Sequence, residues 1–142
     1  MGERIIMIEL SVMMPCYKEA DNLKILLPKI DDVLSGFPFT SEIIIVDTQT
    51  PMDDTAQVCE KFRNVRYVPR NGGNDYGDAV RTGIKSTLGR YVLIMDADGS
   101  HNPEDITRLY DDAGGCDVVT QPGECSAECF GASARRNVQR AE

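Results

Sequence analysis

Two carboxylates, Asp96 and Asp98, stand one residue apart directly after an apolar segment, Tyr91–Met95. Five apolar residues in a row between Gly89 and Gly99 predict a strand that is covered on both faces. Side chains two residues apart on an extended chain point the same way, about 6.6 Å apart. Such carboxylates repel each other unless donors or a cation lie between them, and Mg²⁺ or Mn²⁺ takes oxygen ligands. The pair is a candidate metal site; the alternative is one solvated aspartate and one turn or cap residue.

Length and composition predict one folded domain. The chain has 142 residues, of which 42% are hydrophobic and 27% charged, so it can bury one core. Its net charge of −8 argues against a nucleic-acid partner, because phosphate backbones need a basic surface. No apolar stretch approaches the roughly 20 residues of a membrane span. The N-terminal residues lack the layout of a signal peptide, so we expect a cytoplasmic protein.

The five cysteines are expected to be free thiols, as is usual in a reducing compartment. Cys125 and Cys129 have a C-x-x-x-C spacing, but the chain holds no second pair and only one histidine. This pattern gives only weak support for a zinc site.

Strand and helix patterns alternate along the chain. Apolar, β-prone runs predict strands over Ile5–Met14, Glu42–Val46, Val65–Val68, Tyr91–Met95 and Asp117–Thr120. Apolar residues at helical spacing follow four of these runs, around Leu23–Leu34, Val58–Phe62, Val80–Leu88 and from Asn102 onward. Pro28 is expected to kink or break the first helix. We therefore expect a domain over residues 1–120.

From Gln121 onward the pattern lapses, so residues 121–142 are expected to form an irregular tail or the severed start of something larger. A short helix around Ser133–Ala141 is expected within this segment.

Four strand-then-helix units in a row predict an α/β fold, a mostly parallel sheet with helices on both faces. Ligands of such sheets bind beyond the carboxyl ends of the strands. Polar or glycine-rich segments fall at that edge four times, at Pro15–Glu19, Asp47–Asp54, Arg70–Gly77 and Asp96–His101. The sequence therefore predicts that one edge of one sheet carries the site.

Several motif classes are excluded. The chain has neither G-x-G-x-x-G after its first strand nor G-x-x-x-x-G-K-[ST], which argues against dinucleotide-binding folds and P-loop NTPases. A calcium loop starting at Asp96 would have His101 in place of its glycine and Thr107 in place of its glutamate. Asp-Ala-Asp-Gly-Ser resembles the nucleophile segment of haloacid-dehalogenase-like phosphatases, but it follows the fourth strand rather than the first. A phosphatase of this class is kept as a hypothesis that ranks behind the two given below.

Four segments taken together resemble family 2 glycosyltransferases of the GT-A fold, in their nucleotide-sugar half. They are Met14-Pro-Cys-Tyr-Lys-Glu19, Ile45-Val-Asp47, Gly77–Gly83 and Met95–Glu104. The match runs from about Leu10 to Thr120 and is strongest with dolichol- or polyprenyl-phosphate hexose synthases. It implies a Rossmann-like GT-A fold that is truncated after this half, since the part that normally supplies the acceptor site is absent.

The resemblance implies transfer of a hexose from a UDP- or GDP-linked donor to a polyprenyl or dolichyl phosphate at a membrane surface, assisted by Mg²⁺ or Mn²⁺. The alternative is a non-catalytic nucleotide-sugar-binding module. The donor base, the sugar, the acceptor, the oligomeric state and the catalytic competence of this chain stay open.

The resemblance also implies a role for each site residue. The base pocket falls on Pro15, Tyr17 and Glu19, and the base or ribose contact on Asp47. Asp96 and Asp98 would be the catalytic pair that holds the sugar-nucleotide diphosphate through the metal ion. Arg70 and Arg81 are candidate diphosphate contacts by their charge and position only. The residue types alone leave other roles open. Tyr17 can pack, Glu19 can act as a helix N-terminal acid, both arginines can be solvated, Gly72-Gly73 can be a plain turn, and His101 can be a loop residue before a helix cap.

Three positions depart from the family pattern. The second strand ends in Asp47-Thr48 where two acids are usual, and Lys18 stands where the first motif commonly has asparagine. Gln121-Pro-Gly replaces a Gly-Ser-Arg segment, so an expected donor-phosphate arginine is missing.

Overall fold

A computed structural model describes residues 7–113, 118–120 and 133–136, with side chains described over residues 7–111. Strands and helices alternate through most of this part of the chain, as the sequence predicts. The strands are β1 (Leu10–Pro15), β2 (Ser41–Asp47), β3 (Val65–Pro69), β4 (Tyr91–Ile94), β5 (Val118–Thr120) and β6 (Ser133–Arg136). The helices are α1 (Ala20–Ser35), α2 (Thr55–Cys59), α3 (Tyr76–Ser86) and α4 (Asp105–Ala113).

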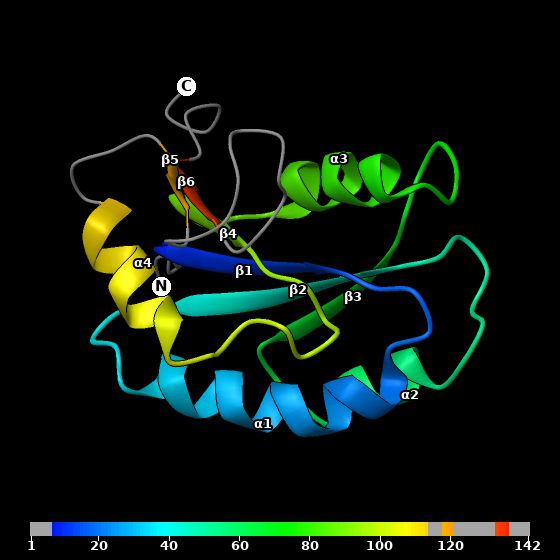
Figure 1. The fold of residues 1–142 in the computed structure, drawn as a ribbon, viewed down its shortest axis with the longest axis horizontal. Coiled ribbons are helices and arrows are strands. Elements are labelled where there is room, and N and C mark those ends of the chain that lie inside the picture. The colour runs from blue at the N-terminus through cyan, green and yellow to red at the C-terminus, as the bar shows by residue number, and fades with distance from the viewer. Residues whose placement is uncertain (1–6, 114–117, 121–132, 137–142) are drawn as a thin grey trace, which may run out of the picture.

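The strands form one sheet in the order β3-β2-β1-β4-β6-β5. The pairs β2–β3, β1–β2 and β1–β4 are parallel, whereas β6 runs antiparallel to both β4 and β5. In Figure 1, α3 covers one face of the sheet and α1 and α2 cover the other. The mostly parallel sheet with helices on both faces is therefore confirmed.

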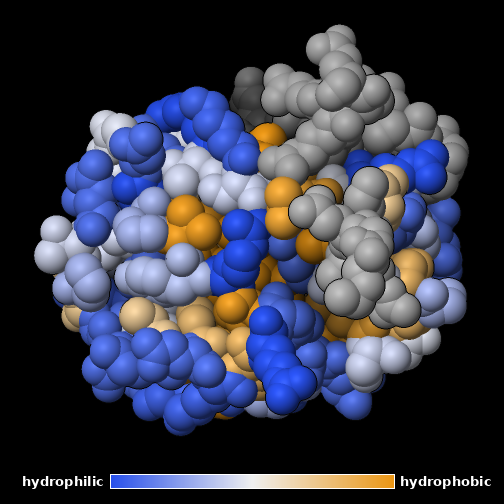
Figure 2. All heavy atoms as spheres, turned by 180° about the vertical axis from the view of Figure 1, so that it is seen from behind, coloured by the Kyte–Doolittle hydropathy of each residue, from blue (hydrophilic) through white to orange (hydrophobic). Residues whose placement is uncertain are grey.

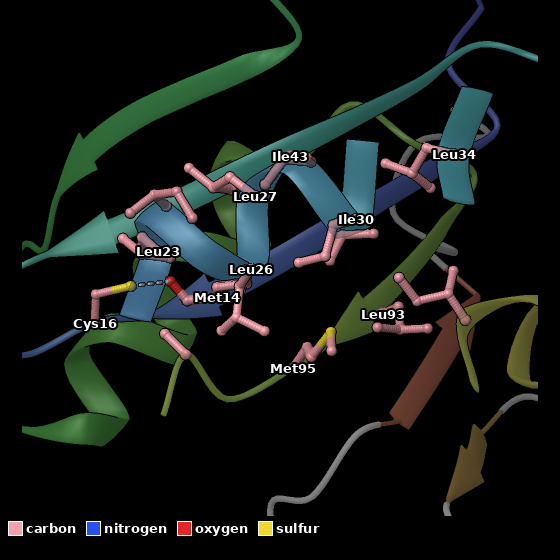
Figure 3. Close-up of a cluster of buried hydrophobic side chains, with 14 of the residues drawn as sticks. Met14, Cys16, Leu23, Leu26, Leu27, Ile30, Leu34, Ile43, Leu93 and Met95 are labelled. Carbon is pink, nitrogen blue, oxygen red and sulfur yellow. Dashed lines mark hydrogen bonds between the residues drawn. The ribbon is translucent and has the colours of Figure 1, made fainter. Parts of the chain in front are cut away.

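Successive side chains of β1 point to opposite faces of the sheet, as in any β-strand. Val12 and Met14 belong to the larger core cluster, which also holds Leu23 and Leu27 of α1 and Ile106 of α4. Figure 3 shows Leu23, Leu26, Leu27 and Ile30 of α1 in this cluster together with Leu93 and Met95. Met13, which lies between Val12 and Met14 in β1, belongs to a smaller cluster under α3. Each fully buried side chain of this size contributes about 1.5–3 kcal/mol.

Three local expectations are corrected by the structure. Helix α1 runs through Pro28 without a break, because Pro28 is exposed and water can reach the carbonyl that its ring leaves without a donor. Helix α3 ends at Ser86, so Leu88 is not part of its apolar stripe and is half exposed. Residues 133–136 form β6 rather than the start of a helix.

A buried polar network holds the edge of the sheet opposite the predicted site. Ser11, which interrupts the apolar run of β1, donates to Glu42 Oε1 at 2.7 Å and accepts the backbone N–H of Gly89 at 2.8 Å. The backbone N–H of Leu88 donates to the same Glu42 oxygen at 2.7 Å, and Arg66 pairs with the other one at 3.1 Å. Buried polar groups are therefore satisfied here by one another.

The surface is largely polar on the face seen in Figure 2, where hydrophobic residues show as small patches between hydrophilic ones. Among the helices of the described ranges, none combines the length and the apolar character that crossing a membrane requires.

Candidate functional site at the carboxyl edge of the sheet

A cavity of about 320 Å³ lies at the carboxyl ends of the parallel strands. In Figure 1, the loops that follow β1, β2 and β3 gather at this edge, on the right of the view. The cavity is lined by the last residue of β1, the first residue of α3 and the loops that follow β1, β3 and β4, namely Pro15, Cys16, Tyr17, Glu19, Arg70, Asn74, Tyr76, Asp96, Ala97 and Asp98. The structure thus brings together six of the eight predicted site residues.

Asp96 is held from two sides. Its backbone N–H donates to His101 Nδ1 at 3.2 Å, and its carboxylate accepts a hydrogen bond from the Tyr76 hydroxyl. Burial of Tyr76 and its proximity to the Asp96 charge raise the pKa of this phenol to about 12, so the hydroxyl remains a donor at neutral pH.

Asp98 is exposed at the rim of the same cavity. Hydrogen bonds from the Ser100 hydroxyl and from the Ser100 backbone N–H, the latter at 2.9 Å to Oδ1, hold the pKa of this carboxyl below its usual range. Asp98 is therefore a carboxylate at neutral pH, with one oxygen fixed by the turn that Gly99 makes at φ +85°.

The donor set suits a hard divalent ion that is shared with a ligand. In the part of the chain that the structure describes, no three His, Cys, Asp or Glu side chains gather closely enough to hold a metal by themselves. Two carboxylates at a cavity mouth match Mg²⁺ or Mn²⁺, which keep waters and complete their coordination with the oxygens of a bound diphosphate. Asp96 and Asp98 would be the residues that hold the ion.

Arg70 joins three loops under the cavity and is only 5% exposed. Its Nε donates to the Asp47 carbonyl at 3.1 Å, its Nη1 to the carbonyls of Asn74 and Asp75, and its Nη2 to the Cys16 carbonyl. Guanidinium donors used in this way fix the loops that follow β1, β2 and β3 relative to one another. Arg70 is thus not a solvated surface arginine, and the cavity wall retains its charge.

Asp47 ends β2 and is 1% exposed, so its carboxylate lies behind the cavity lining rather than in it. Oδ2 accepts the Tyr67 hydroxyl at 2.6 Å, while Oδ1 is buried with no hydrogen-bond partner among the described residues. Burial and the bond to Asp47 raise the pKa of Tyr67. A buried carboxylate oxygen without a donor is costly, and it is suited to accept an N–H from a ligand that displaces the lining.

The first loop presents Tyr17, which is 54% exposed at the cavity, above a buried Pro15. Lys18 has φ +54°, in the left-handed region that asparagine adopts more readily than lysine. Glu19 accepts the Asn22 side-chain amide at 2.6 Å and makes no side-chain cap bond to α1. Both Tyr17 and Glu19 therefore line the cavity, and Glu19 also stands at the N-cap position of α1.

The side chain that accepts a hydrogen bond from the first residue of α1 belongs to Asp53, which the sequence did not indicate for this role. Asp53 Oδ2 accepts the backbone N–H of Ala20 at 3.0 Å, and Oδ1 accepts the Thr55 hydroxyl and backbone N–H. Burial acts to raise the pKa of Asp53, but these hydrogen bonds outweigh it, so the pKa is lowered. Asp53 therefore ties the start of α1 to the loop after β2.

Arg81 lies outside the cavity. Its exposed side chain is paired with the largely buried Asp78 of α3, and it lines a separate hollow with Asn71, Gly72 and Lys85, among others. Gly73, at φ +157°, packs so closely that a Cβ there would lie 2.6 Å from Asp78 Oδ2. The Gly72-Gly73 pair thus allows close approach to the N-terminus of α3.

Sequence reasoning missed Tyr76 and Asn74, which line the cavity. Tyr76 is the first residue of α3, and it would have been noticed only by asking which side chains the third loop places opposite Asp96. Asn74 reads as an ordinary loop residue, although its Oδ1 accepts the backbone N–H of Gln49 at 3.0 Å and joins two loops.

Residues 11–135 match the sequence model of the family described as "Glycosyl transferase family 2". The chain is 34% identical over 104 residues to a dolichol-phosphate mannosyltransferase of Pyrococcus furiosus, covering 71% of this chain and 29% of that protein. It is 30% identical over 135 residues to a dolichyl-phosphate beta-glucosyltransferase of Homo sapiens, covering 85% of this chain and 40% of that protein.

Solved structures share the fold at low sequence identity. Mannosyl-3-phosphoglycerate synthase from Rubrobacter xylanophilus has a TM-score of 0.72 at 18% identity, over 92% of this chain and 54% of that one. Glucosyl-3-phosphoglycerate synthase from Mycobacterium tuberculosis, in complex with Mn²⁺, uridine diphosphate and phosphoglyceric acid, has a TM-score of 0.71 at 18% identity, over 91% and 56%.

Proposed function

Because the chain belongs to glycosyl transferase family 2, we propose that it carries the donor-binding part of a hexosyltransferase. The donor is a UDP- or GDP-linked hexose, and the acceptor is a polyprenyl or dolichyl phosphate. The chain spans 29–40% of the length of the curated relatives it matches, so the activity of a whole enzyme is part of the proposal. The acceptor class is supported by the names of those relatives.

One observation carries this proposal: Asp96 and Asp98 meet Arg70 and Tyr17 around a single cavity at the carboxyl edge of a parallel sheet. The two carboxylates offer hard oxygen ligands, Arg70 contributes positive charge, and Tyr17 offers an exposed ring. A nucleoside diphosphate has the matching parts, namely metal-binding oxygens, negative charge and a flat base. Membership of this family also weighs against the phosphatase reading of the Asp-Ala-Asp-Gly-Ser segment.

The protein groups are placed to bind and orient the donor. We assign the diphosphate to Asp96 and Asp98 through Mg²⁺ or Mn²⁺, with Arg70 acting by its charge because its N–H groups bond to carbonyls. When bound, the divalent ion would supply Lewis-acid stabilisation of the negative charge that develops on the departing diphosphate. A structural neighbour holding Mn²⁺ with uridine diphosphate supports this choice of ion.

The base is assigned to the cavity wall formed by Pro15, Tyr17 and Glu19, with Asp47 as the acceptor for a base or ribose donor. The unpartnered Oδ1 of Asp47 supports that role. Because this atom is covered in the present structure, binding would have to open the lining over it. Arg81 lines a different hollow and is not included in the donor site.

In the proposed reaction, an acceptor phosphate oxygen forms a bond to the anomeric carbon of the hexose while the bond from that carbon to the diphosphate breaks. The acceptor oxygen is already ionised near neutral pH, so no general base is required to activate it. Because a polyprenyl phosphate resides in a bilayer, we place this reaction at a membrane surface, on the cytoplasmic side.

The proposal is tested by titrating UDP, GDP, UDP-glucose and GDP-mannose into the purified chain by calorimetry, first with Mn²⁺ and then with chelator. Binding of one nucleotide family that requires the metal is expected, and it would identify the base. Absence of binding by a chain shown to be folded by circular dichroism would contradict the assignment of a donor site to this chain.

A further inference from the structure

We propose that His101 is a positioning residue for the carboxylate loop, residues 96–101, and that its imidazole fixes the backbone from which Asp96 and Asp98 project. This inference rests on the proposed function, because it concerns how that loop is held ready for a metal-bound diphosphate. His101 is only 4% exposed although it lies in the loop between β4 and α4. A polar ring is buried without penalty only where its nitrogens are hydrogen-bonded.

The hydrogen bond from the Asp96 backbone determines which ring nitrogen of His101 carries the proton. The backbone N–H of Asp96 points at His101 Nδ1 with an N···N distance of 3.2 Å. A backbone N–H can only donate, so Nδ1 must be the unprotonated acceptor and the neutral ring carries its proton on Nε2. The lone pair of Nδ1 is thereby directed at Asp96 and is not available as a metal ligand.

The far end of the loop is anchored in the core. Asn102 accepts the backbone N–H of Glu104 through its side chain at 3.0 Å, and its carbonyl accepts the N–H of Asp105 at 3.0 Å. Helix α4 then buries Ile106, which is 1% exposed. His101 therefore stands next to a rigid helix start and links it back to Asp96, the first residue of the loop.

Between these two ends, the loop holds Asp98 in a turn closed by the Ser100 N–H bond to Asp98 Oδ1 at 2.9 Å. With the bond to His101 in place, both carboxylates emerge from a closed six-residue loop. Without it, a metal-bound diphosphate would have to order that loop on binding. The loss of one neutral hydrogen bond corresponds to a roughly 3- to 10-fold weaker metal-dependent affinity.

Three substitutions separate this role from simple filling of space. His101→Asn places an amide oxygen where Nδ1 now accepts, so it is expected to keep the bond to Asp96. His101→Gln carries the same amide one atom further out, and His101→Leu fills the space with no acceptor. The Asn and Gln pair differs in the position of the acceptor rather than in polarity, so the comparison stands even if the Leu variant does not fold.

The first readout needs no ligand. Imidazole ¹⁵N shifts in the free chain are expected to show a neutral ring with its proton on Nε2. Hydrogen exchange of the Asp96 amide is expected to speed up roughly 3- to 10-fold in His101→Gln and His101→Leu but not in His101→Asn, while the Met95 amide, bonded to the Met13 carbonyl, stays protected. A proton on Nδ1, or equal exchange of the Asp96 amide in all folded variants, would overturn the proposal.

The second readout is calorimetric affinity for whichever of UDP or GDP the wild-type chain binds, with Mn²⁺ and with chelator. A 3- to 10-fold loss in His101→Gln that appears only with Mn²⁺, and that His101→Asn restores, is the expected result. An equal loss with and without metal would mean that His101 only supports the fold and would overturn the positioning role. If the wild-type chain binds no nucleotide, the proposed function fails, while exchange and ¹⁵N shifts still decide whether His101 holds the loop.

Discussion

Arg70 is predicted to be the main stabilising residue of the site, although it looks like a surface arginine in the sequence. The perturbation is Arg70→Met, which keeps much of the length of the aliphatic stem and removes the guanidinium. That group donates to the carbonyls of Cys16, Asp47, Asn74 and Asp75, which lie in the loop after β1, at the end of β2 and in the loop after β3. Removing it is therefore expected to loosen these three segments at once.

The magnitude follows from what each carbonyl can do afterwards. Asn74 and Asp75 are exposed, so water can replace the lost donors. The Asp47 carbonyl keeps the backbone N–H of residue 70 at 2.9 Å. The carbonyl of Cys16, a residue that is 1% exposed, is left unpaired, and an unsatisfied buried acceptor costs about 1–3 kcal/mol. The other guanidinium hydrogen bonds are charged, and water replaces them only in part, which adds to this cost. The expected total loss of unfolding free energy is therefore about 2–4 kcal/mol.

The assay is urea unfolding at pH 7, with Arg81→Met as the matched control. Arg81 is two-thirds exposed and makes one ion pair with the largely buried Asp78, whose carboxylate keeps the backbone N–H of Asp75 at 3.2 Å, so this variant is expected to lose no more than about 1 kcal/mol. Equal unfolding free energies for Arg70→Met and Arg81→Met would refute the reasoning.

Three other changes test separate parts of the structure. Gly89→Ala would place a Cβ 2.6 Å from Ser11 Oγ and 2.7 Å from the Ser11 backbone nitrogen, so thermal unfolding should show a loss of about 1–3 kcal/mol; an unchanged Tm would contradict the packing. Tyr67→Phe removes the hydroxyl donor of the buried Asp47 carboxylate and should cost about 1–3 kcal/mol in urea, whereas wild-type stability would show that the bond is not needed. The lowered pKa of Asp53 means that its folded carboxyl loses its proton more easily than the unfolded one, so its stabilisation is complete above about pH 4 and is lost as the pH falls through the folded value. The stability difference between wild type and Asp53→Asn should therefore shrink in unfolding curves taken from pH 6 to pH 2.5, and a difference that does not change with pH would argue against it.

The sheet could be predicted from the sequence because its signal is local. Ile43–Val46 is an unbroken apolar run, which only a strand covered on both faces can bury, and polar residues begin where the parallel strands stop. The same logic could not find β6. Its sequence, Ser-Ala-Arg-Arg, carries no apolar run, and its place between β4 and β5 is set by backbone pairing with strands that are distant in the chain.

For the site, residue type and position after a strand were enough to predict that Asp96 and Asp98 lie at the carboxyl edge of the sheet. They were insufficient where a role depends on partners from several loops. The carbonyls that bury Arg70 belong to residues between 4 and 54 positions away, and no pattern around position 70 reveals them. Tyr76 likewise reads as an ordinary first residue of a helix until the fold places it against Asp96.

The most direct test of the central claim, that Asp96 and Asp98 hold a nucleoside diphosphate through a divalent ion, is the Mn²⁺-dependent nucleotide affinity of Asp98→Asn. This change removes the charge while keeping an oxygen that can accept the Ser100 N–H, and Asp111→Asn on the exposed side of α4 is the matched control. Loss of the metal-dependent part of the affinity in Asp98→Asn alone, with unfolding curves unchanged, is the predicted result. Retention of metal-dependent binding in Asp98→Asn would contradict the account.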